Sequence, residues 1–354
     1  MTVQRLLRVR QKPAKRFALT LALQGLPRFV GGRCWLGFLS LLVALSAHSG
    51  DYSEREVAAS VIAKVQAEGV DPTWARDLID AAQRQQSILD AISRPAEKTK
   101  PWYDYRQIFI TERRIREGVA FWQNHDSVLT EVTDRTGVPA EVIVAIIGVE
   151  TFYGRITGSY RVIDALATLA FDYPKRSPFF TAELEQFLVL AWESGKDALA
   201  LKGSYAGAMG YGQFMPSSYR AYARAFDGES APDIWDSPAD AISSVGHYLM
   251  AHGWRRGEDV VVDAIAEGVD PSVFGGSLKP TQTVAMLASE GLVSPQEMEP
   301  ATRATPLQLE TAEGPRYWLG LQNFYVITRY NHSAMYAMAV WELSQAIVAG
   351  RTTP

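Results

Sequence analysis

The stretch EVIVAIIGVET at residues 141–151 is the most apolar part of the chain beyond its N-terminal 49 residues. Pro139 comes just before it, at a position where proline commonly opens a helix. We therefore expect a helix over residues 139–151. Apolar spacing and helix-start signals predict further helices, which make the fold mainly α. They cover residues 53–69, 71–93, 111–135, 163–171, 178–193, 216–226, 237–252 and 333–349.

One carboxylate interrupts the apolar helix. Glu150 follows Ile143, Ile146 and Ile147 at spacings of seven, four and three residues, which place these side chains on one face. Burial disfavours the ionised form, as does the helix dipole in the last turn. Both effects raise the pKa of Glu150, as a general acid near neutral pH requires. Taken alone, the helix favours a structural glutamate held by an arginine or by backbone donors.

A glycine-rich segment reads KGSYAGAMGYGQFMPSS at residues 202–218. Its glycines let the backbone approach a ligand closely, and Ser204 and Gln213 supply neutral donors and acceptors. Neutral polar groups beside aromatic faces suit sugars. A purely structural loop is an equally good explanation. The aromatic side chains of this segment are Tyr205, Tyr211 and Phe214.

A third polar and aromatic group precedes the last predicted helix. It consists of Tyr330, Asn331 and Ser333, with Tyr336 one turn further on. A capping role explains these residues as well as a binding role does, with Asn331 or Ser333 as the N-cap of that helix. Nucleophilic triads find no support, because no GxSxG sequence occurs and the single cysteine lies in the N-terminal segment.

The N-terminal 49 residues are expected to form a signal peptide with a long basic region. Eight Lys or Arg and no Asp or Glu occur there, and the apolar run WLGFLSLLVALSA fills residues 35–47. Small residues fit cleavage after Ser49, with residues 44–46 as a second candidate. An uncleaved inner-membrane anchor is the alternative. Cys34 lies before the apolar run, so we expect a periplasmic protein without a lipid anchor.

Charge and composition exclude one class of function. The chain has 354 residues and a net charge of -4, but residues 50–354 alone carry a net charge of -12. An acidic protein is not drawn to anionic polymers by its overall field, so we expect no nucleic-acid partner.

Residues 257–315 differ from the helical remainder. Val260–Val262 is β-branched, Gly and Pro are frequent, and helical periodicity is weak. We expect a small β-containing insert here. It leaves an N-terminal helical region at residues 50–135 and a catalytic core made of residues 136–256 and 316–354.

Four long segments resemble one known family. They are IIGVETFYGRITG at residues 146–158, DALATLAFDYPKR at 164–176, LKGSYAGAMGYGQFMPSSY at 201–219 and NFYVITRYNHSAMYAMAVWEL at 323–343. Over most of residues 100–350 the sequence is similar to the membrane-bound lytic murein transglycosylase B family, including its soluble form. The resemblance implies a lysozyme-like catalytic core with an additional helical domain and a small β domain.

The resemblance also implies a reaction. Enzymes of this family cleave the β-1,4 bond between N-acetylmuramic acid and N-acetylglucosamine in peptidoglycan without adding water, and they leave a 1,6-anhydromuramic acid end. Peptidoglycan glycan strands are therefore the expected partner. Proteins of cell-wall synthesis or division fit the same function, but no residue pattern identifies them.

Residue by residue, Glu150 matches the family's single catalytic acid and base. Tyr105 and Arg176 match further groove positions, with Lys175 in place of a second arginine. The remaining positions of the saccharide groove match Ser204, Gln213, Tyr330, Asn331 and Tyr336.

Family members bind calcium in an EF-hand-like loop, and this chain departs from that pattern. Ala225 and Ser230 stand where the loop needs Asp and Gly. We expect no required cofactor, and calcium is the weaker alternative. The acids left for it are Asp227, Glu229 and Asp240.

Two rival functions are open. A lysozyme-type hydrolase needs a second carboxylate to activate water, and Asp164, Asp172 and Glu183 are the nearest acids in sequence. A non-enzymatic peptidoglycan-binding scaffold needs no acid at all, and an intact Glu150 argues against it.

Overall fold

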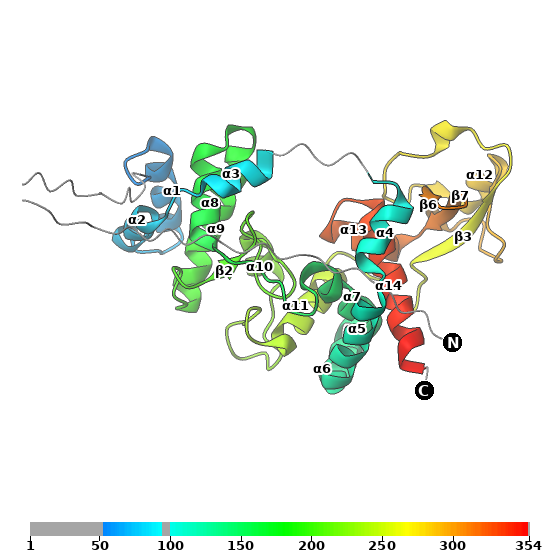
Figure 1. The fold of residues 1–354 in the computed structure, drawn as a ribbon, viewed down its shortest axis with the longest axis horizontal. Coiled ribbons are helices and arrows are strands. Elements are labelled where there is room, and N and C mark those ends of the chain that lie inside the picture. The colour runs from blue at the N-terminus through cyan, green and yellow to red at the C-terminus, as the bar shows by residue number, and fades with distance from the viewer. Residues whose placement is uncertain (1–51, 94–99, 353–354) are drawn as a thin grey trace, which may run out of the picture. The chain divides into compact units, whose positions relative to one another are not determined.

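The computed structural model describes residues 52–93 and 100–352, over which the fold is mainly α, as predicted (Figure 1). The predicted signal peptide lies outside the described residues. None of the described helices is both long and apolar enough to cross a membrane.

Helices α1 to α3 pack against α8 and α9. Val61 and Val65 of α1 are buried in this contact, whereas Val57 is 43% exposed. Because α8 and α9 come from the predicted core segment, this packing crosses the expected boundary at residue 135. The bounds are Glu56–Ala67 for α1, Pro72–Ala81 for α2, Gln86–Ser93 for α3, Val162–Asp172 for α8 and Ser177–Ser194 for α9. A short strand, β1 (Tyr160–Arg161), pairs with β2 (Lys202–Gly203).

The predicted single helix over residues 111–135 is wrong. The structure has two helices there, α5 (Glu112–Asn124) and α6 (Asp126–Thr136). His125 separates them with φ -126° and ψ 24°. Asn, His and Asp in succession are weak helix formers, which explains why the chain turns here. Helix α4 (Trp102–Phe109) precedes this pair and was not predicted.

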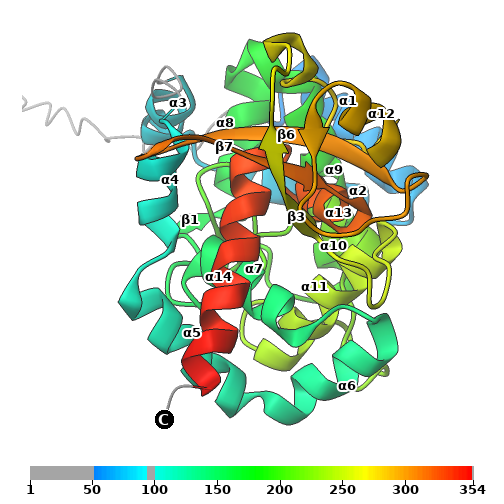
Figure 2. The same cartoon turned by 90° about the vertical axis from the view of Figure 1, so that its right-hand side faces the viewer.

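Helix α7 (Ala140–Thr151) confirms the predicted apolar helix. Ile143, Ile146 and Ile147 are completely buried. The helix packs against α5, α11 (Pro238–Ala251) and α14 (Ala334–Thr352). Figure 2 shows α14 passing in front of α7, beside α5.

Two further short helices adjoin the two polar segments identified in the sequence, the glycine-rich loop and the Tyr-Asn-His-Ser sequence. Helix α10 (Pro216–Tyr222) follows the glycine-rich loop, and α13 (Gln322–Tyr330) ends at the Tyr-Asn-His-Ser sequence. Between the two candidate caps of α14 the structure selects Ser333, whose Oγ accepts a hydrogen bond from the Tyr336 backbone N–H at 3.3 Å.

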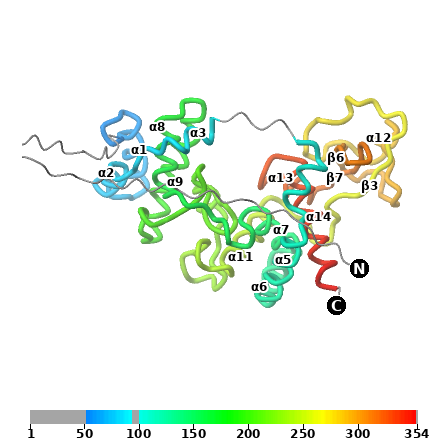
Figure 3. The backbone as a smooth tube through the Cα atoms, viewed as in Figure 1, coloured from blue at the N-terminus to red at the C-terminus, as the bar shows by residue number. Residues whose placement is uncertain are grey.

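A five-stranded antiparallel sheet with strand order β4-β6-β7-β3-β5 forms the β-containing part. Figure 3 shows β3, β6 and β7 of this sheet near α12. Val262 pairs with Leu319, and both side chains are buried in a small separate core with Leu287 of α12. Strand β7 runs to Gly320, five residues beyond the predicted end of the insert at residue 315. The bounds are Val261–Ala266 for β3, Gln282–Thr283 for β4, Val284–Ser289 for α12, Leu292–Val293 for β5, Arg303–Thr311 for β6 and Gly314–Gly320 for β7.

Tyr153, just after α7, fills a slot between two helices. Its hydroxyl donates to the Arg114 carbonyl oxygen at 2.8 Å. A Cβ atom at Gly148 would lie 2.6 Å from this hydroxyl, and one at Gly118 would lie 2.5 Å from it. The close packing of α5 and α7 around the tyrosine therefore needs both glycines.

We predict that Gly148→Ala lowers the free energy of unfolding by about 1–3 kcal/mol, because the added methyl group meets the buried Tyr153 ring. Chemical denaturation of the variant and the parent checks this. Gly276→Ala is the matched control, since a Cβ there meets no atom within 4 Å. Equal losses in both variants would contradict the packing explanation.

Candidate active site

Glu150 lies in the last turn of α7, and one of its oxygens is held by a tyrosine. Tyr336 Oη, on α14, donates to Glu150 Oε1 at 2.5 Å. Burial raises the pKa of Glu150 from its ordinary value to about 7, and the hydrogen bond from Tyr336 opposes this shift. The raised pKa predicted from the apolar helix face is confirmed. Among the described residues Glu150 forms no ion pair. The alternative of a structural glutamate held by an arginine is therefore excluded within this part of the chain.

Three tyrosines surround this carboxylate. The pKa values of Tyr336 and Tyr330 are raised well above their ordinary value, chiefly by burial and then by the charge of Glu150. Burial and Glu150 also raise the pKa of Tyr105, on α4. All three phenols therefore remain protonated, and those of Tyr336 and Tyr330 act as hydrogen-bond donors. Tyr330 Oη donates to the Gly212 carbonyl oxygen at 2.6 Å and fixes the glycine-rich loop beside the acid.

The turn that follows Glu150 is strained and tightly tied. Phe152 and Tyr153 both have left-handed backbone angles, with φ of 52° and 60°. Thr151 Oγ1 donates to the Tyr211 carbonyl oxygen at 2.8 Å and accepts from the Gly154 N–H at 3.0 Å. One side chain thus joins the end of α7 to the glycine-rich loop.

The glycine-rich loop is held against the same turn from its other end. A Cβ at Gly158 would lie 2.0 Å from the Gly203 carbonyl oxygen, so the two backbones touch directly. Gln213, with a left-handed φ of 51°, donates from Nε2 to the carbonyl oxygens of Thr157 at 3.1 Å and Gly210 at 3.0 Å. These contacts hold the glycine-rich loop in a defined conformation, and its position depends on the turn after α7.

A cavity of about 420 Å³ opens between these elements. The structure brings Glu150, Ser204 and Gln213 together with Tyr330 and Asn331 in its wall. The complete lining is Glu150, Ser204, Tyr205, Ala206, Ala208, Gln213, Phe214, Met215, Ser218, Tyr248, Tyr330 and Asn331.

The other sequence-predicted residues lie outside this wall. Tyr336 lies behind Glu150 and contacts it by the hydrogen bond described above, and Tyr105 is near enough to be affected by the charge of Glu150. Arg176 is not brought to the cavity. It is exposed, and its guanidinium lies 4.4 Å from the ring centre of Phe179.

Ser204 has a structural task in addition to its place in the cavity wall. Its Oγ accepts hydrogen bonds from the backbone N–H groups of Ala206 at 3.3 Å and Ala208 at 3.1 Å. This turn projects Tyr205 outward, where 44% of the residue is exposed. The hydroxyl hydrogen of Ser204 remains to donate to a ligand.

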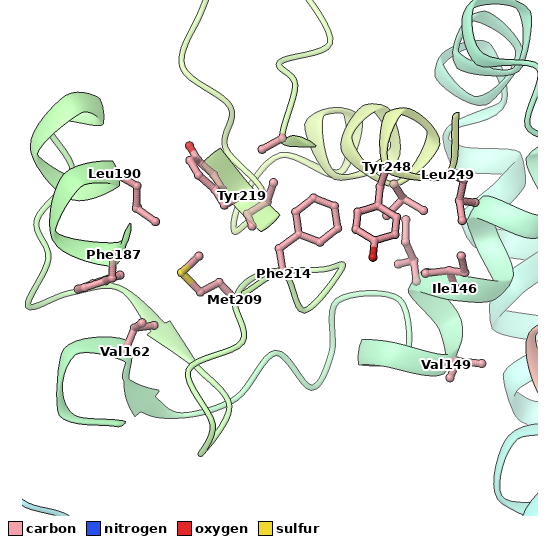
Figure 4. Packing of buried hydrophobic residues seen from close by; sticks show 14 of the residues in the cluster. Ile146, Val149, Val162, Phe187, Leu190, Met209, Phe214, Tyr219, Tyr248 and Leu249 are labelled. Atoms are coloured by element: carbon pink, nitrogen blue, oxygen red, sulfur yellow. The ribbon is translucent and has the colours of Figure 1, made fainter. Parts of the chain in front are cut away.

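Sequence reasoning missed the aromatic wall contributed by α11. Tyr248 packs with Phe214 at 5.6 Å between ring centroids (Figure 4). It also packs with Tyr330 at 4.8 Å between ring centroids. The only signal in the sequence was an aromatic residue on a predicted helix, which is equally typical of a core position.

No second carboxylate faces Glu150 across the described cavity. The acids that a hydrolase could use are Asp164, Asp172 and Glu183. Each of them forms an ion pair or a hydrogen bond with a residue outside the cavity wall. Their partners are Arg161 at 2.6 Å for Asp164, Tyr52 at 2.6 Å for Asp172, and the Ser217 hydroxyl at 2.7 Å for Glu183.

The degraded EF-hand-like loop does not gather a set of ligands. Asp240 accepts hydrogen bonds from the backbone N–H groups of Phe226 and Asp233, and Asp227 accepts from those of Glu229 and Ser230. Within residues 52–93 and 100–352, no three His, Cys, Asp or Glu side chains lie close enough to hold a metal ion.

Comparison with known proteins identifies the family of the chain. The chain matches the family model described as the transglycosylase SLT domain over residues 53–345. Membrane-bound lytic murein transglycosylase B of Escherichia coli (strain K12) is 44% identical over 312 residues, covering 85% of each chain. The catenated lytic transglycosylase SltB1 from Pseudomonas aeruginosa is 48% identical with a TM-score of 0.81, covering 85% of this chain and 100% of that one. SltB3 from the same organism, in complex with NAG-anhNAM-pentapeptide, is 31% identical with a TM-score of 0.74, covering 82% and 78%.

The family match includes every helix and strand that lines the cavity around Glu150. Sequence identity and fold similarity extend over the same part of the chain. The chain therefore belongs to the transglycosylase SLT domain family, as a lytic transglycosylase of the murein transglycosylase B type.

Proposed function

We propose that Glu150 serves as both general acid and general base in a non-hydrolytic cleavage of peptidoglycan. The bond cleaved is the β-1,4 bond between N-acetylmuramic acid and N-acetylglucosamine, and the product carries a 1,6-anhydromuramic acid end. One observation carries this proposal. Glu150 is the only carboxylate in the wall of the described cavity, and its pKa is raised to about 7.

In the first step the neutral carboxyl group donates its proton to the glycosidic oxygen, and the bond from that oxygen to C1 breaks. Tyr336 occupies Oε1 as a hydrogen-bond donor, which leaves Oε2 to carry the proton. A carboxyl group that is half protonated near pH 7 is suited to this transfer. The positive charge that develops at C1 is met by the 2-acetamido oxygen of the muramic acid.

In the second step the ionised Glu150 accepts the proton of the muramic C6 hydroxyl, whose oxygen bonds to C1. The proton balance closes, because Glu150 ends the cycle protonated and no water is consumed. The nucleophile belongs to the substrate, so its attack is intramolecular and needs positioning rather than a second carboxylate. The engagement of Asp164, Asp172 and Glu183 in other contacts favours this reaction over hydrolysis.

Peptidoglycan is the substrate class that the relatives support, since one is named a murein transglycosylase and another was solved with a NAG-anhNAM-pentapeptide. In this chain Ser204, Gln213 and Asn331 offer neutral polar groups to sugar hydroxyls and acetamido groups. The exposed ring of Tyr205 offers an apolar face to a sugar ring. The same proposal places the enzyme in the periplasm, exported by the predicted signal peptide and active without calcium.

We predict that Glu150→Gln lowers the release of soluble muropeptides from purified sacculi by about 10³-fold, because the amide can neither donate nor accept the proton. Mass spectrometry of the products checks this. The parent should release fragments one water lighter than the products of hydrolysis. Glu141→Gln, in the first turn of the same helix, is the matched control and should keep the parent's activity. Full activity of Glu150→Gln would overturn the assignment.

We predict that kcat/KM is highest below pH 7 and falls by about tenfold per pH unit above it, because Glu150 must be protonated and its pKa is about 7. Tyr336→Phe removes the hydrogen bond that lowers this pKa, so the alkaline limb should move to higher pH. Rate profiles from pH 5 to 9 on soluble glycan fragments measure both. A limb that stays in place in the variant would show that Tyr336 does not affect the acid.

The raised pKa also has a consequence for stability. Between the ordinary pKa of Glu150 and about 7, the folded protein binds more protons at this group than the unfolded chain, so its contribution to stability falls as the pH rises. We expect Glu150→Gln to be more stable than the parent at pH 8, by about 2–4 kcal/mol, and to lose this advantage at pH 4. Denaturation at the two pH values tests the sign.

A further inference from the structure

A second cavity, of about 560 Å³, lies between α4, the β6–β7 hairpin and α14. These elements contact one another, and Figure 2 shows α4 and the two strands beside the upper part of α14. The volume is within the range of small-ligand sites. No step of the proposed reaction uses this cavity.

The wall of this cavity combines aromatic faces with flat polar groups. Three tryptophans line it: Trp102 of α4 and Trp318 of β7, which are only 3% and 6% exposed, and Trp341 of α14, which is half-buried. Tyr103 and Gln345 stand at its exposed parts, and 37% of Tyr103 is accessible. The accessible parts of the Trp341 and Tyr103 rings suit the apolar face of a sugar, and the planar amide of Gln345 suits its hydroxyl rim.

The charges in the wall balance. Arg106 forms an ion pair with Glu342, and Arg316, which lies 5.1 Å from the Trp318 ring centre, pairs with Asp263 outside the wall. Glu313 is the remaining acid of the lining, so two cations face two anions. Such a wall does not select a charged peptide, and it favours a neutral, hydroxyl-rich ligand.

Two helices that line the second cavity, α4 and α14, also carry side chains near Glu150. Helix α4 carries Trp102 in this wall and also Tyr105, whose pKa is raised in part by the charge of Glu150. The two rings are 6.2 Å apart between centroids. Helix α14 likewise carries both Trp341 and Tyr336. Helices α4 and α14 therefore each carry one side chain near Glu150 and others in the wall of the tryptophan-lined cavity.

We propose that this cavity is a second saccharide-binding site, which takes neutral N-acetylated amino sugars of a peptidoglycan glycan strand away from the bond being cleaved. The proposal rests on the proposed function, because it assumes a glycan substrate at Glu150. It makes the tryptophan-lined cavity a source of affinity for long glycan strands.

The test measures binding alone, in the non-cleaving Glu150→Gln background. Three ligands are compared: intact sacculi, glycan strands stripped of their stem peptides by an amidase, and the free stem peptides. Tyr103→Ala combined with Gln345→Ala removes two exposed side chains of the wall, one from each helix. Ile108→Ala is the matched control, since it is 45% exposed on the same helix α4 but outside the wall. Circular dichroism confirms that each variant is folded.

We expect the double variant to bind stripped glycan strands about tenfold more weakly than the Ile108→Ala control, a loss of about 1.4 kcal/mol. Equal binding by both would overturn the proposal. A loss that appears only with stem peptides present would also overturn it, because the cavity would then recognise the peptide. Failure of the proposed function is distinct, since it would show as a parent enzyme that binds glycan but releases no anhydro products.

Discussion

The site depends on the turn that ends α7. The backbone leaves the helix through two successive left-handed residues, Phe152 and Tyr153, which cost conformational energy that surrounding contacts must offset. The Thr151 hydroxyl supplies one such contact by joining this turn to the Tyr211 carbonyl, and the buried Tyr153 ring supplies another. This strained turn therefore fixes the glycine-rich loop in front of Glu150.

That arrangement explains how one acid is sufficient. The apolar helix face raises the pKa of Glu150, while Tyr336 donates to one oxygen and limits the shift. Desolvation and hydrogen bonding act in opposite directions on the same carboxyl group, and together they set its pKa near neutrality. In the proposed reaction the nucleophile comes from the substrate, so the remaining task of the protein is to position sugars, which the loop and the aromatic wall of Tyr248 and Tyr330 can do.

The sequence correctly predicted those features that follow from local periodicity. The apolar spacing around Glu150 correctly predicted a buried helix and a raised pKa. It failed where tertiary contacts decide. The contact of Tyr248 with Tyr330 is of this kind, since the two residues are distant in sequence. The break at His125 was missed for a local reason, because Asn124, His125 and Asp126 are weak helix formers within an otherwise helical pattern. The sequence also could not predict that Gln213 anchors the loop by donating to the Thr157 carbonyl oxygen. A glutamine in a glycine-rich loop has no preferred partner by spacing alone.

The central claim is that the C6 hydroxyl of the substrate, and not water, attacks C1. Digestion of purified sacculi in water enriched in oxygen-18 tests it most directly, with the isotope content of the released muramic ends read by mass spectrometry. The single acid at Glu150 predicts anhydro ends that contain no oxygen-18. Reducing ends with one oxygen-18 atom at C1 would contradict the account, because water would then be the nucleophile.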